Sequence, residues 1–284
     1  MAARNTPTAR QRRLATEMRR LREQAGLSTT QAAALLGSDR TMVSNIEAGR
    51  TGLSGERVRQ IASLYRCPDP ALVDALAAMA GGRRSHCWWE EYRGKLPDGF
   101  LDVSEIEHHA ARIRTVQTVH LPGLLQTEDH ARALFEVVVP ELSRLEVELR
   151  VAHRLGRQAV LGGADPTPYS AVVHETALRM RFGSRKTVIA QLRHLIEAGE
   201  RDNVTLTVIP FHAGGFPGAD QSVLYVEGAV PRLDTVQLDS EFGPVFIDSP
   251  TPLVNYRTLL RLIEQRSLPP AESRDFIHSI ARDV

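Results

Sequence analysis

The stretch GLSTTQAAALLGSDRTMVSNIEAGR, residues 26–50, decides the fold of the first part of the chain, because helix start and stop signals recur in it at short intervals. Ser28 and Gln31 have the spacing of a capping box, in which each side chain binds the backbone amide of the other at a helix start. Gly37 ends that helix, and Asp39 is a good N-cap for the next one. The pattern predicts two short helices joined by a tight, glycine-containing turn.

Similar signals on both sides of this stretch extend the prediction to five helices. Between residues 10 and 24, apolar side chains recur at i, i+4 and i+7, which is typical of a helix with one apolar face. Ser54 opens a fourth helix, and Asp69 followed by Pro70 places an N-cap and a proline at the start of a fifth. Residues 1–82 are therefore expected to form an all-α domain.

Two short helices joined by such a turn have the geometry of a helix-turn-helix, whose second helix enters the major groove of DNA. A small helical bundle without a DNA role would explain the caps equally well. It would not explain why the third helix keeps four long or polar side chains off its apolar face, which are Arg40, Thr41, Met42 and Asn45. DNA binding is therefore the favoured interpretation.

The stretch from Gly26 to Gly37, together with residues 43–50, resembles the Xre/phage-repressor helix-turn-helix family. The resemblance implies that the N-terminal residues of the third helix read bases, which here are Arg40, Thr41 and Asn45. An arginine can bind guanine bidentately and an asparagine can bind adenine in the same way. Met42 departs from a reading role, because its side chain can contact only methyl groups.

The same resemblance implies two further roles. Phosphate contacts are expected from Thr29, at the N-terminus of the second helix where free amides and the helix dipole favour an anion, and from Ser44 and Arg50. Glu47 is expected to pair with Arg22 as structural scaffolding, so that Glu47 is not a catalytic carboxylate.

The distribution of charge agrees with a nucleic-acid partner for the first part of the chain. Residues 1–84 hold 14 arginines and 7 acidic residues, whereas the remaining 200 residues carry a net charge of −6. A cationic module attached to an anionic body is typical of a protein that binds a polyanion through one domain. Solvated basic helices would produce the same numbers, so that charge alone does not decide the question.

The sequence Gly81-Gly82-Arg83-Arg84-Ser85 is interpreted as a linker, and residues 83–284 as a second, α+β domain with a small antiparallel sheet. A capping box at Ser104 and Glu107 predicts a helix that extends to about Arg114. The other helices are expected at 128–138, 141–161, 184–196, about 251–265 and after Pro269-Pro270. Alternating patterns predict strands at 169–174, 204–209, 222–226 and 235–238.

The second part of the chain is similar, over nearly its whole length, to the C-terminal domain of a family of actinobacterial antitoxin-like regulators. The residues that carry the similarity are Leu121-Pro122-Gly123-Leu124-Leu125-Gln126-Thr127, Arg157-Gln158-Ala159-Val160-Leu161, and Val208-Ile209-Pro210-Phe211 with Gly214, Pro217 and Gly218. The similarity implies a regulator that works with a small partner protein encoded nearby. It implies no established activity for this domain.

No dense catalytic or cofactor motif is found in the sequence. It lacks a GxxxxGK[ST] loop, an HExxH pair and a GxSxG elbow, and the glycines at 214, 215 and 218 precede a strand rather than a helix. His86 and Cys87 near Cys67 are the least implausible metal cluster, but no fourth ligand is evident. We therefore expect a protein that is not an enzyme, with no cofactor and no metal.

Composition places the chain in a reducing compartment. Two cysteines can form at most one bridge, and no apolar run reaches the ~18 residues that a membrane span needs. The arginine-rich start is not followed by the apolar segment of a secretory signal. The expectation is a cytoplasmic protein that does not bind a membrane.

Large aromatic side chains lie near turn-rich segments of the second part, where a ligand pocket can open. The candidate lining residues are Trp88, Trp89, Phe211 and His212, with Tyr92 and Phe216 nearby. The alternative is that these rings pack between domains or against the sheet, as an apolar cluster after a linker commonly does.

Two functions from different classes remain at this point. The first is a transcriptional regulator. It reads double-stranded DNA through residues 1–82, the head, and uses residues 83–284, the body, for homodimerisation and for response to a partner protein or ligand. The second is a DNA-targeted enzyme or toxin-like protein with an unrecognised catalytic body. The absence of a catalytic motif favours the first.

Overall fold

The computed structural model describes residues 6–80, 87–240 and 243–284. The chain forms two compact units, one of residues 1–90 with 229–233 and one of residues 91–228 with 234–284. The first unit thus takes in five residues from the far part of the chain, which the expected domain of residues 1–82 does not contain. The predicted linker at 81–85 lies outside the described residues.

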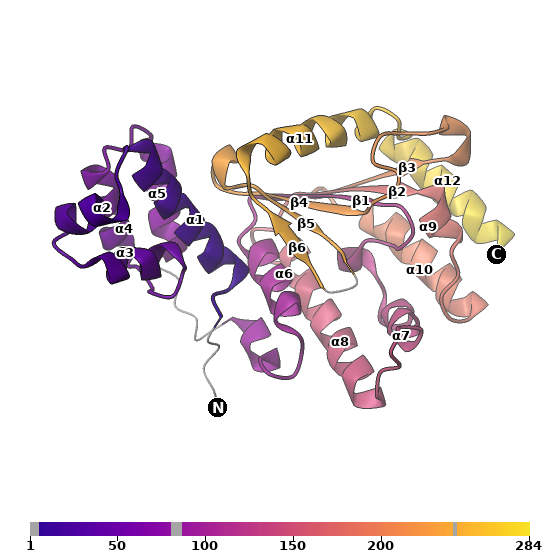
Figure 1. The fold of residues 1–284 in the computed structure, drawn as a ribbon. Coiled ribbons are helices and arrows are strands. Elements are labelled where there is room, and N and C mark those ends of the chain that lie inside the picture. Colours follow the sequence, from indigo (N-terminus) through magenta and orange to yellow (C-terminus); the bar gives the residue numbers. More distant parts are fainter. Residues whose placement is uncertain (1–5, 81–86, 241–242) are drawn as a thin grey trace. The chain divides into compact units, whose positions relative to one another are not determined.

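The described part of the first unit contains the five predicted helices, coloured indigo to purple in Figure 1. Their bounds are α1 Ala9–Gln24, α2 Thr29–Leu35, α3 Arg40–Glu47, α4 Gly55–Leu64 and α5 Pro70–Ala80.

The predicted caps of these helices are confirmed. Ser28 Oγ accepts from the Gln31 amide at 3.2 Å, and Gln31 Oε1 accepts from the Ser28 amide at 2.9 Å. Asp39 Oδ1 accepts from the Met42 amide at 2.7 Å, which starts α3. Because each cap is a contact between residues three apart, local sequence is enough to set where these helices begin.

The core of the first unit is built from the apolar faces of its helices and from the distant segment 229–233. Met18, Ile61 and Leu76 are almost completely buried at its centre. Leu233, which is 7% exposed, belongs to the same cluster. The segment 229–233 therefore supplies part of the hydrophobic core of the head.

The second unit has a helix-rich α+β fold, which confirms the predicted class. Its strands are β1 Arg112–Gln117, β2 Tyr169–His174, β3 Val204–Ile209, β4 Val223–Glu227, β5 Thr235–Leu238 and β6 Val245–Ile247. Its α-helices are α6 Asp98–His108, α7 Glu128–Glu136, α8 Arg144–Arg157, α9 Glu175–Arg179, α10 Arg185–Ala198, α11 Pro250–Glu264 and α12 Pro270–Asp283. Short 3-10 turns lie at η3 Gly123–Leu125, η4 Gln158–Leu161 and η5 Phe211–Ala213, and η2 Trp88–Tyr92 crosses from the first unit into the second.

The sheet is mixed, which corrects the expectation of a small antiparallel sheet. Its six described strands have the order β3-β2-β1-β4-β5-β6. The pairs β1–β2 and β2–β3 are parallel, whereas β4, β5 and β6 add antiparallel strands on the other side of β1. Alternation along a strand shows which residues share a face but carries no information on direction. The helical connections β1–α7–α8–β2 and β2–α9–α10–β3 are long enough for parallel pairing.

The predicted helix from Ser104 to Arg114 is wrong. Helix α6 already begins at Asp98 and ends at His108, and β1 follows from Arg112. Ser104 lies inside α6, where its hydroxyl donates to the Phe100 carbonyl at 3.2 Å, one turn earlier. The spacing of Ser104 and Glu107 matches a capping box, but both residues make tertiary contacts instead.

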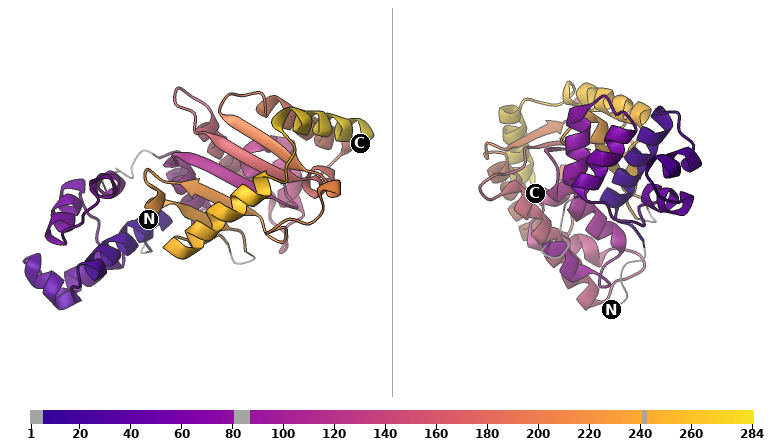
Figure 2. Two further views of the ribbon diagram at one scale, coloured as in Figure 1. Left: turned by 90° about the horizontal axis from the view of Figure 1, so that it is seen from above. Right: turned by 90° about the vertical axis from the view of Figure 1, so that its left-hand side faces the viewer.

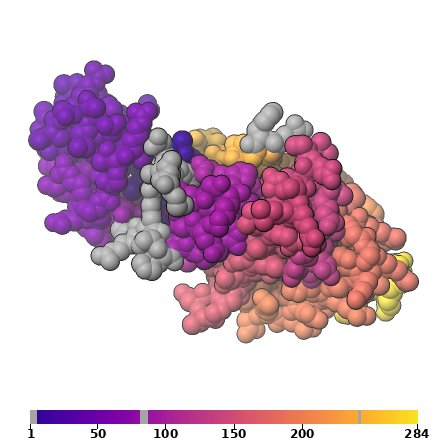
Figure 3. Space-filling view, turned by 90° about the horizontal axis from the view of Figure 1, so that it is seen from below, coloured from indigo at the N-terminus to yellow at the C-terminus, as the bar shows by residue number. Residues whose placement is uncertain are grey.

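Two helical layers cover the sheet. Helix α11 (gold) crosses one face, as the view from above shows (Figure 2, left), and its Leu253, Leu260 and Ile263 pack against Val116 and Tyr225. Helices α6, α8 and α10 lie on the other face (Figure 1), and Figure 3 shows the surface of that layer in magenta to orange.

The β3 edge of the sheet is covered by the chain around α12. The Val208 amide donates to Ser273 Oγ at 2.9 Å, and the Val208 carbonyl accepts from the Leu268 amide at 2.8 Å. These contacts satisfy backbone groups that an open edge strand would present to another chain.

Candidate nucleic-acid interface

Helix α3 separates an inward apolar side from an outward polar side. Val43 and Ile46 are 1% and 6% exposed and belong to the core of the first unit. Arg40, Thr41 and Ser44 are exposed. The α3 side chains predicted to meet DNA therefore lie on the solvent side of the helix, as a reading helix requires.

The outward cations of this region are available for a ligand. Arg40 and Arg50 are exposed, and their side chains have no ion pair or hydrogen bond within the described residues. Arginines of α1 behave differently, since Arg19 pairs with Glu23 at 2.8 Å. Part of the positive charge of the head is thus neutralised internally, and the α3 region keeps unpaired guanidinium groups.

The remaining predicted contacts occupy the ends of α2 and α3. Thr29 is the first residue of α2 and is half-buried, as is Asn45 in the last turn of α3. Gly49 has φ 70°, a left-handed conformation that glycine adopts without steric cost. This turn lets the Arg50 amide donate to the Asn45 carbonyl at 2.9 Å, which closes the helix and leaves the Arg50 side chain in solvent.

Arg22 and Glu47 form the ion pair that the resemblance implies. Arg22 Nε and Nη2 donate to the two Glu47 carboxylate oxygens at 2.6 and 3.1 Å, and Nη1 donates to the Leu27 carbonyl at 2.6 Å. The two side chains are only 8% and 10% exposed. The pair joins α1, the start of α2 and the end of α3, so it holds the reading helix against the rest of the head.

A second buried charge network in the first unit was missed by sequence reasoning. Glu17, whose side chain is 0% exposed, accepts from Arg13 at 2.7 Å, from Arg20 at 2.5 Å and from Arg232 of the segment 229–233 at 2.8 Å. Burial raises the pKa of Glu17, but the three guanidinium groups outweigh it and hold that pKa below its usual value. The available signal was that Glu17 lies on the apolar face of α1, next to Met18.

The four aromatic and histidine residues predicted to line a pocket fall in different units. Trp88 and Trp89 belong to the first unit, whereas Phe211 and His212 belong to the second. Trp89 is 3% exposed, and Phe211 is 54% exposed with its ring 5.4 Å from that of His174. The second unit does contain a cavity of about 190 Å³, but other residues line it. Two of its polar groups, Thr115 and Gln117, lie on β1, which was not predicted, and the others are brought beside them by contacts between residues far apart in the chain.

The metal cluster considered at His86, Cys87 and Cys67 falls partly outside the described residues, because His86 is not among them. No three His, Cys, Asp or Glu side chains gather within the described ranges in a way that could hold an ion. Neither Cys67 nor Cys87 forms a disulfide among the described residues. Within the same residues, no helix is both long and apolar enough to cross a membrane.

The first unit is a helix-turn-helix domain, and the fold and the exposed face of α3 define a DNA-binding regulator as the class of protein. A family model for a helix-turn-helix domain matches residues 13–76. The model of a second family, described as a domain of unknown function (DUF5753), matches residues 100–279. Because that match spans more than half of the chain, the protein belongs to the DUF5753 family. Comparison with curated proteins and with solved structures gave no match.

Proposed function

We propose that this protein is a sequence-specific, Xre-type transcription regulator in which α3 reads operator bases. The observation that carries the proposal is the solvent side of α3, where Arg40, Thr41 and Ser44 are exposed and Arg40 has no described ion-pair partner. A guanidinium without an internal partner can bind the O6 and N7 acceptors of a guanine bidentately. Asn45, one turn further along, takes the corresponding role toward an adenine.

Phosphate contacts complete the proposed interface. Arg50 follows the C-terminus of α3 in solvent, Ser44 is exposed on the helix, and Thr29 stands at the first position of α2. Such contacts fix the position of a protein on the duplex without reading its sequence. They also release counterions, so that affinity falls as salt rises.

The second unit is proposed to provide dimerisation and the response to a signal. One helix-turn-helix covers a single half-site, and two heads held together gain affinity through their high effective concentration. We further propose an antitoxin-like role with a small partner protein and no catalytic activity. The support is the ordered sequence motifs described above.

The experiment that tests the proposal compares three arginine variants of the full chain. An operator is first selected from randomised duplexes, and binding is then measured on it and on a scrambled duplex across a range of salt concentrations. Arg40→Ala is expected to weaken operator binding by about 1–3 kcal/mol and to relax preference at one base pair, with a much smaller effect on the scrambled duplex. Arg50→Ala is expected to weaken both duplexes about equally and to reduce the salt slope by about one unit.

Arg59→Ala is the matched control, because it removes one positive charge from α4, where Arg59 pairs with Asp74 in solvent. Its effect on both duplexes should be small. If Arg40→Ala lowers both affinities by the same factor, Arg40 contacts phosphate and the assignment of base reading fails. If the selection yields no preferred duplex, the proposal of a sequence-specific regulator fails. If the chain cleaves or modifies the DNA, the alternative function, a DNA-targeted enzyme, replaces it.

A further inference from the structure

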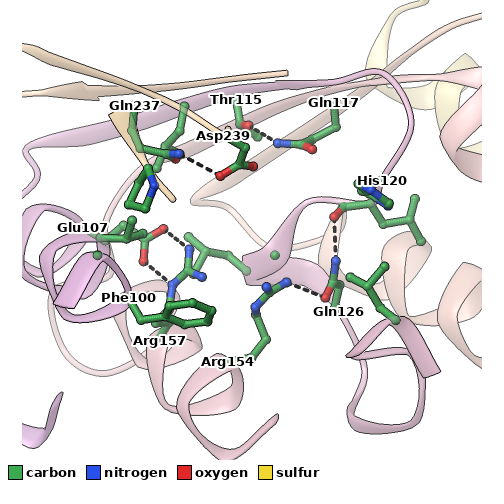
Figure 4. A pocket seen from close by; sticks show the side chains of 18 of the residues that line it. Phe100, Glu107, Thr115, Gln117, His120, Gln126, Arg154, Arg157, Gln237 and Asp239 are labelled. Carbon is green, nitrogen blue, oxygen red and sulfur yellow. Dashed lines mark hydrogen bonds and ion pairs between the residues drawn. The ribbon is translucent and has the colours of Figure 1, made fainter. Parts of the chain in front are cut away.

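The cavity of about 190 Å³ in the second unit lies between the sheet and the helices α6 and α8 (Figure 4). Thr115, Gln117 and Gln237 line it from the sheet, and Glu107, Arg154 and Arg157 line it from the helices. Figure 4 shows these two groups facing each other across the cavity. The cavity therefore has two polar walls inside a folded unit.

The sheet wall is polar at positions that are apolar on the opposite face. Thr115 and Gln237 are 2% and 6% exposed, and both pair in register with Leu224 between them. Their strand neighbours Val116 and Val236 point to the other face and pack under α11. Both side chains are hydrogen-bonded within the protein, Thr115 Oγ1 to the Val223 carbonyl at 2.8 Å and Gln237 Nε2 to Asp239. These bonds offset the cost of burying polar groups and keep a polar surface on this face of the sheet.

The two glutamines leave acceptors unused. Gln117 Nε2 donates to Thr115 Oγ1 at 3.0 Å, and Gln237 Nε2 donates to Asp239 Oδ1 at 2.8 Å. Their side-chain carbonyl oxygens receive no hydrogen bond from any residue that the structure describes. These oxygens can accept from a hydroxyl or an N–H of a ligand.

The helix wall holds one neutralised and one unneutralised cation. Arg157 binds both oxygens of the buried Glu107 at 2.6 and 2.8 Å. Arg154 instead donates through Nη1 to Gln126 Oε1 at 2.6 Å and lies over the Phe135 ring, with no carboxylate in ion-pair contact within the described residues. Nε and Nη2 of Arg154 have no acceptor there, although guanidinium N–H groups pair strongly with oxyanions.

The electrostatic setting of Arg154 agrees with this geometry. Burial, reinforced by the neighbouring Arg157 and partly opposed by Glu107 and Asp239, lowers the pKa of Arg154 to about 9. The guanidinium therefore remains charged at neutral pH but is destabilised by its surroundings. An anion placed beside it would remove that destabilisation.

We propose that this cavity binds a small organic monocarboxylate, with Arg154 as the carboxylate-binding residue and the glutamines of the sheet wall at the other end of the ligand. The planar guanidinium fork matches a carboxylate bidentately. Arg157 is neutralised by Glu107, and Asp239, which also lines the cavity, accepts from Gln237 and makes no ion pair with Arg154 among the described contacts. The guanidinium of Arg154 is therefore the group that a ligand carboxylate would bind.

The cavity also limits ligand size. A cavity of ~150 Å³ accepts benzene, and pockets for drug-sized ligands begin near ~300 Å³. At about 190 Å³ the cavity fits a molecule only slightly larger than benzene. A small carboxylate would then be the signal to which the second unit of the proposed regulator responds. Only this regulatory effect rests on the proposed function, because binding of the carboxylate does not require DNA.

The test is calorimetric titration of the full chain with three carboxylates, each compared with its neutral amide. The pairs are acetate and acetamide, benzoate and benzamide, and 4-hydroxybenzoate and 4-hydroxybenzamide. We expect saturable binding of 4-hydroxybenzoate, weaker binding of benzoate and no binding of the amides. Arg154→Gln should reduce the affinity for 4-hydroxybenzoate about tenfold or more, because a charge-assisted bond is lost.

Arg114→Gln is the matched control, because Arg114 lies on the same strand as Thr115 and pairs with Glu264 of α11 at 2.7 Å. It should leave the affinity unchanged. Gln117→Leu is a second variant that does not alter Arg154 or Arg157. It should lower the affinity for 4-hydroxybenzoate several-fold and leave the affinity for benzoate unchanged, since only the former has a hydroxyl to donate.

The proposal is overturned if none of the carboxylates binds at millimolar concentration, if the amides bind equally well, or if Arg154→Gln binds 4-hydroxybenzoate like the unsubstituted chain. Operator binding is measured on the same preparations. A chain that binds operator but no carboxylate refutes the pocket proposal alone. A chain that binds carboxylate but no DNA supports the pocket and refutes the regulator.

Discussion

Replacement of Glu47 by alanine tests how the reading helix is held. The substitution leaves Arg22 with its bond to the Leu27 carbonyl and a long contact to Glu23 Oε1 at 3.4 Å. It removes both bonds to the Glu47 carboxylate, in a site where the two side chains are only 8% and 10% exposed. The hydrogen bond to Glu47 also raises the pKa of Arg22, against the opposing effect of burial. The variant therefore contains a mostly buried guanidinium whose remaining carboxylate contact is the long one to Glu23, at 3.4 Å.

The magnitude follows from that burial. Removing one partner of a buried ion pair costs ~3–5 kcal/mol, because the remaining charge is not compensated. We expect the lower end, about 3 kcal/mol, since Arg22 keeps one backbone acceptor and a long contact to the exposed Glu23. This is a large part of the ~5–15 kcal/mol that stabilises a typical domain and corresponds to more than about a hundredfold change in the folding equilibrium.

The assay is urea unfolding followed by tryptophan fluorescence, because Trp88 and Trp89 both belong to the first unit. Asp74→Ala provides the matched control, since it removes an acidic partner from an ion pair whose side chains are 55% and 69% exposed. That change should cost less than about 1 kcal/mol. The double variant Arg22→Met/Glu47→Leu should recover most of the lost stability, because neither charge remains.

A Glu47→Ala chain with the unfolding midpoint of the unsubstituted protein would refute this reasoning. It would mean that Arg22 reaches water once its partner is removed. Equal losses in the Asp74→Ala control would also refute it, since burial would then not be the cause.

Two further perturbations test the segment 229–233 and the buried His130. A chain of residues 1–84 should bind operator more weakly than the full chain, since it lacks the second unit that would hold two heads together. It should also unfold at a lower temperature, since it lacks the segment 229–233. Equal operator affinity, measured by fluorescence anisotropy, would show that the second unit is not the dimerising element. His130 is 2% exposed with neither ring nitrogen hydrogen-bonded, and burial, with smaller effects of Arg154 and His120, lowers its pKa to about 4. The stability that neutral His130 contributes is therefore intact above the unfolded-state pKa of about 6.5 and is lost as the pH falls from there to about 4. His130→Phe should reduce this acid sensitivity in thermal melts of the full chain. An unchanged dependence of the melting temperature on pH would contradict the burial argument.

The helix-turn-helix half was predictable because its determinants are local. The capping box of Ser28 and Gln31 and the cap of Asp39 are contacts over three residues, and the apolar spacing in α1 and α3 follows the helical period. The pairing of Arg22 with Glu47 spans 25 residues, and it was expected only through the resemblance to a family. Strands β2, β3 and β5 were placed correctly, because alternation over a few residues is also local.

The sequence by itself thus determined the helices of the head, the outward face of α3 and the α+β class of the second unit. Only the tertiary structure decided the parallel pairing of β1, β2 and β3, the inclusion of 229–233 in the head and the cavity around Arg154. The physical reason is the range of the contacts. Parallel pairing, the ion pair of Glu17 with Arg232 and the facing walls of the cavity each join residues far apart in the chain. Short-range periodicity carries no information about such contacts.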